Sequence, residues 1–291
     1  MSSVAEIRHH IKSIDDTAKI TRAMHLIASA KMKKAMTAHD QTMRYYNLVR
    51  ANMRFILDNS PDEFKSVYYR EFGARACYLV IAGDKGMCGG YNQDVLKLAL
   101  REVIDKTHLN TRLVTFGHMA THFMERKGFR VDESYLTAVA NPSIDVAREL
   151  AAKICERYRA MEFDEVFVIF TQLQKGGDTK PAMVRLLPIT RESVMDVEPM
   201  HAPIGGIEFE PSMAEALDAM ARHYVSGMLY SALVQSFASE NRARMNAMDS
   251  ATRNADAMHA KLVLQLNHAR QAAITQEINE IIGGNPDSFA L

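Results

Sequence analysis

Residues 4–56 read VAEIRHHIKSIDDTAKITRAMHLIASAKMKKAMTAHDQTMRYYNLVRANMRFI, and this stretch contains neither glycine nor proline. Because these two residues are the usual helix breakers, we expect one long helix. Steps of alternately three and four residues select sixteen positions, of which twelve are apolar. The positions are Val4, Ile7, Ile11, Ile14, Ala18, Thr21, His25, Ala28, Met32, Ala35, His39, Thr42, Tyr46, Val49, Met53 and Ile56. A seam of this period, sustained over many heptads, predicts a helix that packs along another helix.

The C-terminal part of the chain predicts the partner helix. Between Pro211 and Gly283 the only glycine or proline is Gly227. A drifting apolar stripe follows Leu229, Leu233, Phe237, Met245, Met248, Ala255, Leu262, Leu266, Ala269 and Ala273. At 1.5 Å per residue, residues 4–56 would span ~80 Å and residues 212–282 ~105 Å. Because the rest of the chain connects them at one end, we expect an antiparallel coiled coil whose C-terminal helix extends ~25 Å beyond the other, at residues 271–282.

The middle of the chain has a different composition, with 11 of the 14 glycines and 7 of the 8 prolines. Short apolar runs, expected as strands, occur at 76–82, 112–116, 166–171 and 183–188, and helical patterns at 93–106, 118–127 and 143–160. Buried strands separated by helices predict a mostly parallel sheet covered on both faces. The predicted organisation is an α/β fold with long helices: an N-terminal coiled-coil helix at 1–60, a central α/β domain at 61–211 and a C-terminal coiled-coil helix at 212–291.

The overall composition excludes several classes of protein. The chain has 291 residues, with 35 lysines and arginines against 35 acidic residues, and three cysteines. No apolar run approaches the ~20 residues that span a bilayer, and the first residues lack the layout of a signal peptide, so we expect the chain to stay in the compartment where it is made. An odd number of cysteines without CxxC spacing argues against a disulfide framework or a zinc site.

The sequence GDKGMCGG at 83–90 lies where an α/β fold can bind phosphate on backbone N–H groups. Its spacing is neither that of GxGxxG nor that of a P-loop, and no acidic residue closes a second strand at the ribose-binding position. We interpret it as a tight structural turn or a partner-facing loop and expect no cofactor. Cys88 has no local histidine and acid to activate it, so it is interpreted as a bystander thiol.

The histidines do not predict a metal site. His118 and His122 have i, i+4 spacing, but Met119 takes the place of the glutamate in HExxH. The remaining histidine pairs lack ligand spacing beside a carboxylate. We therefore expect solvated helix histidines.

Charge is segregated along the N-terminal helix. From Lys19 to Arg54 there are eight basic residues and one acidic residue, Asp40. Such a basic rod suits an acidic protein surface, a lipid headgroup layer or nucleic acid. Nucleic acid is disfavoured, because no aromatic residue interleaves with the cluster Lys31, Lys33 and Lys34.

Several segments, in the right order, resemble the gamma subunit of F-type ATP synthases. KITRAM at 19–24 and ASAKMKK at 28–34 resemble its N-terminal helix, and AGDKGMCGGYN at 82–92 resembles its central loop. Its C-terminal helix is similar to LYSAL at 229–233, ASE at 238–240, ARM at 243–245, AMDSATRN at 247–254 and NHARQAAITQE at 267–277.

The resemblance implies a central stalk in which a Rossmann-like α/β domain lies between the two ends of an antiparallel coiled coil. The coiled coil would turn inside a hexameric ring of alpha and beta subunits, where catalysis occurs. The lower part would sit on the membrane c-ring beside the epsilon subunit. The chain would thus be a non-catalytic rotor shaft that couples proton or sodium transport to ATP synthesis or hydrolysis. It would bind no nucleic acid and reach the membrane only through the c-ring.

The resemblance also assigns residues to partners. Arg270 and Gln271 match the Ala-Arg-Gln that meets an acidic catch loop of a beta subunit, and Met24 matches a nearby position of the N-terminal helix. The foot that meets the c-ring and epsilon is expected at Glu208, Phe209, Glu210, Lys31, Lys33 and Lys34, and the bearing tip at Ile274, Ile278 and Ile281. The chain lacks the additional cysteine pair of chloroplast relatives, which favours a bacterial protein, peripheral on the cytoplasmic face of the inner membrane.

Two other functions remain open at this point. One is a nucleotide-binding α/β enzyme with helical dimerisation arms, which would need the loop at 83–90 to hold phosphate. The other is a passive coiled-coil scaffold, which would not need an overhanging helix, a basic collar and an apolar tip together.

Overall fold

The computed structural model describes residues 4–59, 66–69, 73–105, 111–174, 178–200, 210 and 212–283. Two long helices, α1 (Val4–Asp58) and α5 (Met213–Gly283), begin and end this part of the chain. Between them lie β1 (Ala76–Ile81), α2 (Tyr91–Asp105), β2 (Arg112–Phe116), α3 (His118–Arg126), β3 (Glu133–Tyr135), α4 (Ile144–Arg159), β4 (Glu165–Leu173) and β5 (Thr179–Leu187), with short 3-10 helices at Val67–Tyr69 and Arg191–Val194. The predicted domain boundaries fall at or beside undescribed residues and stay a prediction.

The chain divides into two compact units, residues 1–28 with 245–291 and residues 29–244. In the first unit, Thr21 Oγ1 lies 2.7 Å from Thr252 Oγ1, and Arg22 donates to Asp256 at 2.7 Å. Ile14 comes before Thr21 on α1, whereas its neighbour Leu262 comes after Thr252 on α5. Lower residue numbers on α1 thus lie beside higher residue numbers on α5. The two helices are therefore antiparallel, as predicted.

The second unit repeats this pairing between the remaining parts of the two helices. His39 Nε2 lies 3.0 Å from Ser231 Oγ, and the hydroxyls of Tyr46 and Ser226 lie 3.2 Å apart. Across both units, none of the sixteen seam positions predicted on α1 is exposed. The heptad spacing therefore identified the buried side of α1 along its whole length.

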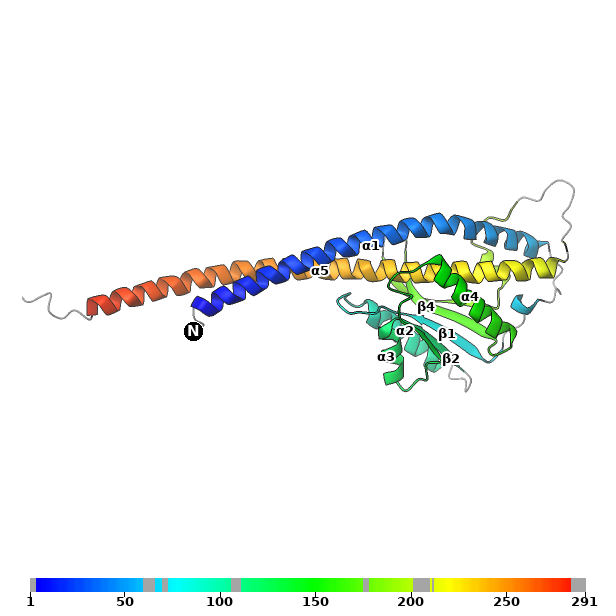
Figure 1. The fold of residues 1–291 in the computed structure, drawn as a ribbon, viewed down its shortest axis with the longest axis horizontal. Helices are drawn as coiled ribbons and strands as arrows, with labels where there is room; N and C mark the ends of the chain where they lie inside the picture. The colour runs from blue at the N-terminus through cyan, green and yellow to red at the C-terminus, as the bar shows by residue number, and fades with distance from the viewer. Residues whose placement is uncertain are drawn as a thin grey trace, which may run out of the picture. The chain divides into compact units, whose positions relative to one another are not determined.

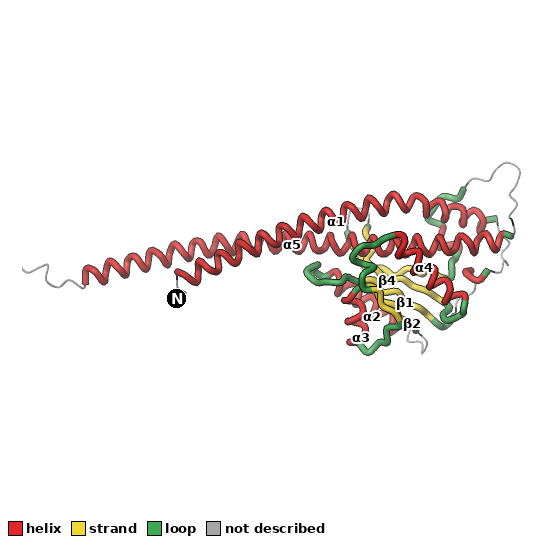
Figure 2. Tube along the Cα trace, in the orientation of Figure 1, coloured by secondary structure: helices red, strands yellow, loops and turns green. Residues whose placement is uncertain are grey.

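The sheet of the second unit has the strand order β3-β2-β1-β4-β5. The first four strands in this order are parallel, and β5 runs antiparallel to β4. This is the strand arrangement of a doubly wound, Rossmann-like sheet with an antiparallel edge. Figure 1 shows the strands with α2 and α3 on one side and α4 on the other, and Figure 2 shows the same layers by type of structure.

Alternate residues of β1 face two separate cores, which confirms that both faces of the sheet are covered. Cys77, Leu79 and Ile81 pack in a core shared with α1, α4 and α5. Tyr78 and Val80 pack in a second core shared with α2 and α3. One face of the sheet thus packs in a core to which α5 contributes together with α1 and α4.

Two strands differ from the prediction. β3 was not predicted, because Glu133–Tyr135 carries no apolar run and stays partly exposed. β5 begins earlier than expected, at Thr179, because its polar first half includes Pro181, which an edge strand tolerates where a central strand would not.

Close packing of Tyr46 explains the glycine within α5, Gly227. A Cβ built at this position would lie 2.1 Å from Cδ1 of Tyr46. The tyrosine ring is buried, and its hydroxyl contacts Ser226. Only glycine lets α1 pack this closely against α5 here.

We expect Gly227→Ala to destabilise the purified chain by about 1–3 kcal/mol, because overpacking costs more than the up to ~1 kcal/mol that alanine gains in helix propensity. Urea unfolding followed by circular dichroism measures the change. The matched control is Gly86→Ala, since an added Cβ there meets nothing within 4 Å. An unfolding free energy unchanged in Gly227→Ala would contradict the packing argument.

Candidate partner-binding site

The position where a doubly wound sheet binds ligands lies beyond the carboxyl ends of β1 and β4, where the strand order reverses. The loop at residues 83–90 is held there by Asn92, whose Oδ1 accepts from Gly83 N at 2.8 Å and whose Nδ2 donates to Lys85 O at 3.2 Å. Asp84 Oδ1 accepts from His118 N at 3.1 Å, so a carboxylate of the chain occupies the N-terminus of α3. An external anion would have to displace it.

Helix α5 fills the rest of this position. Thr171, near the end of β4, donates its N–H to Ser236 Oγ at 3.4 Å and accepts from Ser239 Oγ at 3.3 Å. Arg244 Nη2 donates to Gly86 O at 3.3 Å. The loop is thus bound to the chain's own helix, which favours the structural turn over a phosphate site.

Two further interpretations can be judged from the geometry. Burial raises the pKa of the Cys88 thiol, and the side chain is inaccessible, which fits a bystander. His118 and His122 are exposed. Among the described residues, no group of three or more histidines, cysteines or acids is placed to hold a metal ion.

The basic rod of α1, from Lys19 to Arg54, is partly neutralised by acidic residues. Lys19 pairs with Asp15 at 2.6 Å, and Arg50 pairs with Asp196. By contrast, Lys31, Lys33 and Lys34 form no ion pair with any described residue. These three cations are therefore available to an acidic partner.

Lys31 and Lys34 border a pocket of about 230 Å³ between α1, α5 and the loop at 140–142. Ala35, Ala38, Tyr230, Val234 and Phe237 form much of its lining.

The residues predicted for the foot do not all lie together in the structure. Glu208 and Phe209 lie outside the described residues, and Glu210 is exposed just before α5 begins. Tyr230, beside the lysine pocket, is seventeen residues into α5 from Met213, which is about 25 Å along the helix. The lysines and Glu210 therefore do not form one surface, because the helix keeps them apart.

Arg270 and Gln271 lie on α5 in the other unit, and both are exposed. Met24 is half-buried on α1 and is not beside them. Its neighbour Arg22 pairs with Asp256, which is fourteen residues, or about 20 Å along α5, from Arg270. Met24 and Arg270 therefore lie well apart along the coiled coil, and their contacts with a beta subunit stay a prediction.

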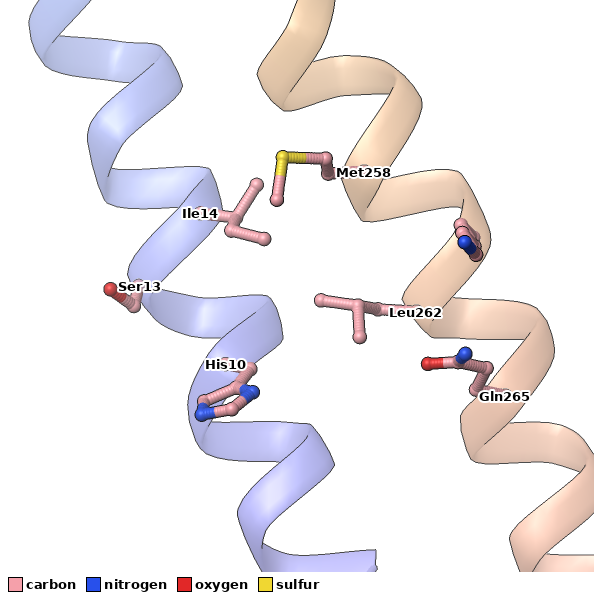
Figure 3. A pocket seen from close by; sticks show the side chains of 7 residues that line it. His10, Ser13, Ile14, Met258, Leu262 and Gln265 are labelled. Atoms are coloured by element: carbon pink, nitrogen blue, oxygen red, sulfur yellow. The ribbon is translucent and has the colours of Figure 1, made fainter. Parts of the chain in front are cut away.

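An apolar groove opens between the two helices of this unit. Figure 3 shows Ile14 of α1 and Met258 and Leu262 of α5 pointing toward one another, at a pocket of about 360 Å³. His10 and Lys261 also line it, and no acidic side chain does. The sequence prediction missed this groove. The one signal for it was Met258, an apolar residue that lies outside the predicted stripe on α5.

Beyond the groove, no helix among the described residues covers α5. Every residue from 271 to 282 is exposed. Ile274 is 53%, Ile278 49% and Ile281 73% exposed. An isolated helix end rarely carries isoleucines this exposed unless a partner covers them.

Comparisons with known proteins identify the family. The family model described as ATP synthase matches residues 3–286. The chain is 38% identical to the ATP synthase gamma chain of Ruminiclostridium cellulolyticum over 288 residues, covering 97% of this chain and 98% of the relative. The chain belongs to the ATP synthase gamma chain family. A gamma chain of Caldanaerobacter subterraneus subsp. tengcongensis is also 38% identical, with 96% and 98% coverage.

Chains of solved mitochondrial ATP synthase structures share the fold. A chain of the Euglena gracilis mitochondrial ATP synthase, in a structure of OSCP, F1 and c-ring, matches with a TM-score of 0.66 at 16% identity, covering 97% of this chain and 93% of that one. A chain of the Tetrahymena thermophila central stalk and c-ring matches with a TM-score of 0.59 at 20% identity, covering 80% and 99%. No helix in the described ranges is long and apolar enough to cross a membrane.

Proposed function

We propose that this chain is the central rotor shaft of a proton- or sodium-translocating F-type ATP synthase. The observation that carries the proposal is the uncovered end of α5, which presents Arg270 and four exposed isoleucines beyond the coiled coil. A shaft needs such an end, because its tip must enter a bearing made by other subunits. An enzyme with dimerisation arms would need an open phosphate site instead, and α5 occupies that position.

In this function the partners are the hexameric ring of alpha and beta subunits, the epsilon subunit and the membrane c-ring. The coiled coil turns inside the ring, and the beta subunits carry out catalysis. The α/β domain receives the torque of the c-ring. The chain is peripheral at the cytoplasmic face of the bacterial inner membrane and touches the membrane only through the c-ring.

The partner-binding residues follow from this placement. Arg270 and Gln271 bind an acidic catch loop of a beta subunit, and Met24 makes a separate contact lower on the coiled coil. Lys31, Lys33 and Lys34 form a basic collar toward an acidic surface of the foot subunits. Glu208, Phe209 and Glu210 form a second foot contact, toward the c-ring.

The proposal is tested by rotation in the assembled complex. A bead is attached at His122→Cys, an exposed position on α3, since the three native cysteines are buried. We expect ATP to drive unidirectional rotation of the bead in a complex with immobilised alpha and beta subunits. A bead that shows only Brownian motion while the complex hydrolyses ATP would overturn the rotor function.

A further inference from the structure

The grip between α5 and the α/β domain uses buried polar contacts where a doubly wound fold would normally hold a ligand. Besides the contacts of Ser236 and Ser239 with Thr171, the N–H of Leu173 donates to Gln235 Oε1 at 3.2 Å. These side chains follow one another along α5 and contact the end of β4. The domain therefore holds its own helix at the position where other members of the fold hold substrate.

A charged pair on α5 makes a second contact with the α/β domain, at the loop after β1. Arg244 Nη2 donates to Glu240 Oε1 at 2.6 Å, one helical turn away, and to Gly86 O at 3.3 Å. The side chain of Glu240 is 10% exposed and that of Arg244 16%. The guanidinium thus bridges α5 and the loop where little of either side chain is exposed to solvent.

The loop fits closely around this pair. A Cβ built at Gly83 would lie 3.0 Å from Cδ of Glu240, so the carboxylate packs tightly against the loop backbone at this glycine. Arg244 and Lys31 favour the charged carboxylate, while Asp84 opposes it. Burial outweighs the favourable charges and raises the pKa of Glu240.

A buried ion pair is a weak source of stability compared with apolar packing, but it fixes a unique geometry. The apolar core already joins the sheet to α5. Apolar contacts are non-directional, whereas charge-assisted hydrogen bonds also fix an orientation. The pair therefore lies where a torque that turns the α/β domain around α5 would act on the contact between them.

We propose that Arg244, positioned by Glu240, is a torsional latch that makes the α/β domain and α5 turn as one body. The latch rests on the proposed function, since it matters only where torque enters at the α/β domain and leaves through the helix. Under load the Arg244 contact to Gly86 resists rotation of the loop around α5. Glu240 keeps the guanidinium in place, and Ser236 and Ser239 resist displacement at β4.

The test measures torsional stiffness in the assembled complex that carries the bead on His122→Cys. With rotation stalled, the angular variance of the bead is inversely proportional to the stiffness between α3 and the immobilised ring. We expect Arg244→Ala to raise this variance about twofold, because a charge-assisted contact is lost. Arg244→Lys, which retains the charge without the planar fork, should give an intermediate value.

Glu240→Gln should also give an intermediate variance, because the arginine keeps a neutral acceptor but loses its ionic partner. It also provides a second route to the answer if Arg244→Ala assembles poorly. The matched control is Arg242→Ala, since Arg242 lies two residues away on α5 and forms no ion pair with a described residue.

The outcomes separate this proposal from the rotor function. Variance equal to that of the parent complex in Arg244→Ala, or in Arg244→Lys and Glu240→Gln together, would overturn the latch while rotation continued. An equal rise in Arg242→Ala would also overturn it, because the effect would then not be specific to the latch. Failure of the parent bead to rotate would instead overturn the proposed function.

Discussion

Arg270→Ala is expected to lower ATP turnover of the assembled complex by at least about tenfold, with alpha and beta subunits still bound. Arg270 is exposed, and no described residue forms an ion pair with it, so its guanidinium is available to a partner carboxylate. Charge-assisted hydrogen bonds contribute about 1.5–3 kcal/mol, and 1.4 kcal/mol corresponds to about a factor of ten in rate. Steady-state ATP hydrolysis by the purified complex measures the loss.

Two further variants show whether the effect belongs to this contact. Arg270→Lys should recover only part of the turnover, because an ammonium lacks the planar fork that binds a carboxylate through two bonds. Arg253→Ala is the matched control, since Arg253 is exposed on the same helix but pairs with Asp249 of its own helix at 2.5 Å. Normal turnover in a fully assembled Arg270→Ala complex would remove Arg270 from the coupling mechanism.

The sequence predicted the coiled coil and the sheet because both depend on local periodicity. A breaker-free segment with a 3,4 seam predicted α1, and a segment interrupted only by Gly227 predicted α5. Short apolar runs predicted β1, β2 and β4 within a few residues. The seam on α1 follows directly from helix geometry, since 3.6 residues per turn return each fourth or third residue to the same side. No tertiary information is needed for such elements.

The missing features depend on contacts between distant segments. Nothing in the spacing of Glu240 and Arg244 alone says that the loop at 83–90 lies against them. The i, i+4 spacing of this pair was visible, but many such pairs are ordinary solvated contacts. Likewise, the separation of Met24 from Arg270 follows only from the register of the two helices, which Thr21 and Thr252 reveal.

The bearing tip gives a prediction with an even larger expected effect. Changing Ile274, Ile278 and Ile281 together to Glu should lower turnover of the complex more than about 100-fold or prevent its assembly. Each site is about half exposed or more in the free chain, and the proposed function places all three inside an apolar sleeve. Leaving a buried polar group unsatisfied costs about 1–3 kcal/mol, more for a charge, and three such groups together reach about 3–9 kcal/mol.

The matched variant changes the same three residues to Ala, which favours helix at least as strongly as isoleucine or glutamate and remains apolar. A bearing must allow rotation, so its contacts have to be non-directional and tolerant of shape. The alanine triple variant should therefore keep turnover within about twofold of the parent, because its surface still avoids desolvation of charge. ATP hydrolysis and the amount of copurified alpha and beta subunits are measured for both variants. If the glutamate and alanine variants behaved alike, apolarity of the tip would not matter, and torque would have to be guided by Arg270 and the coiled coil alone.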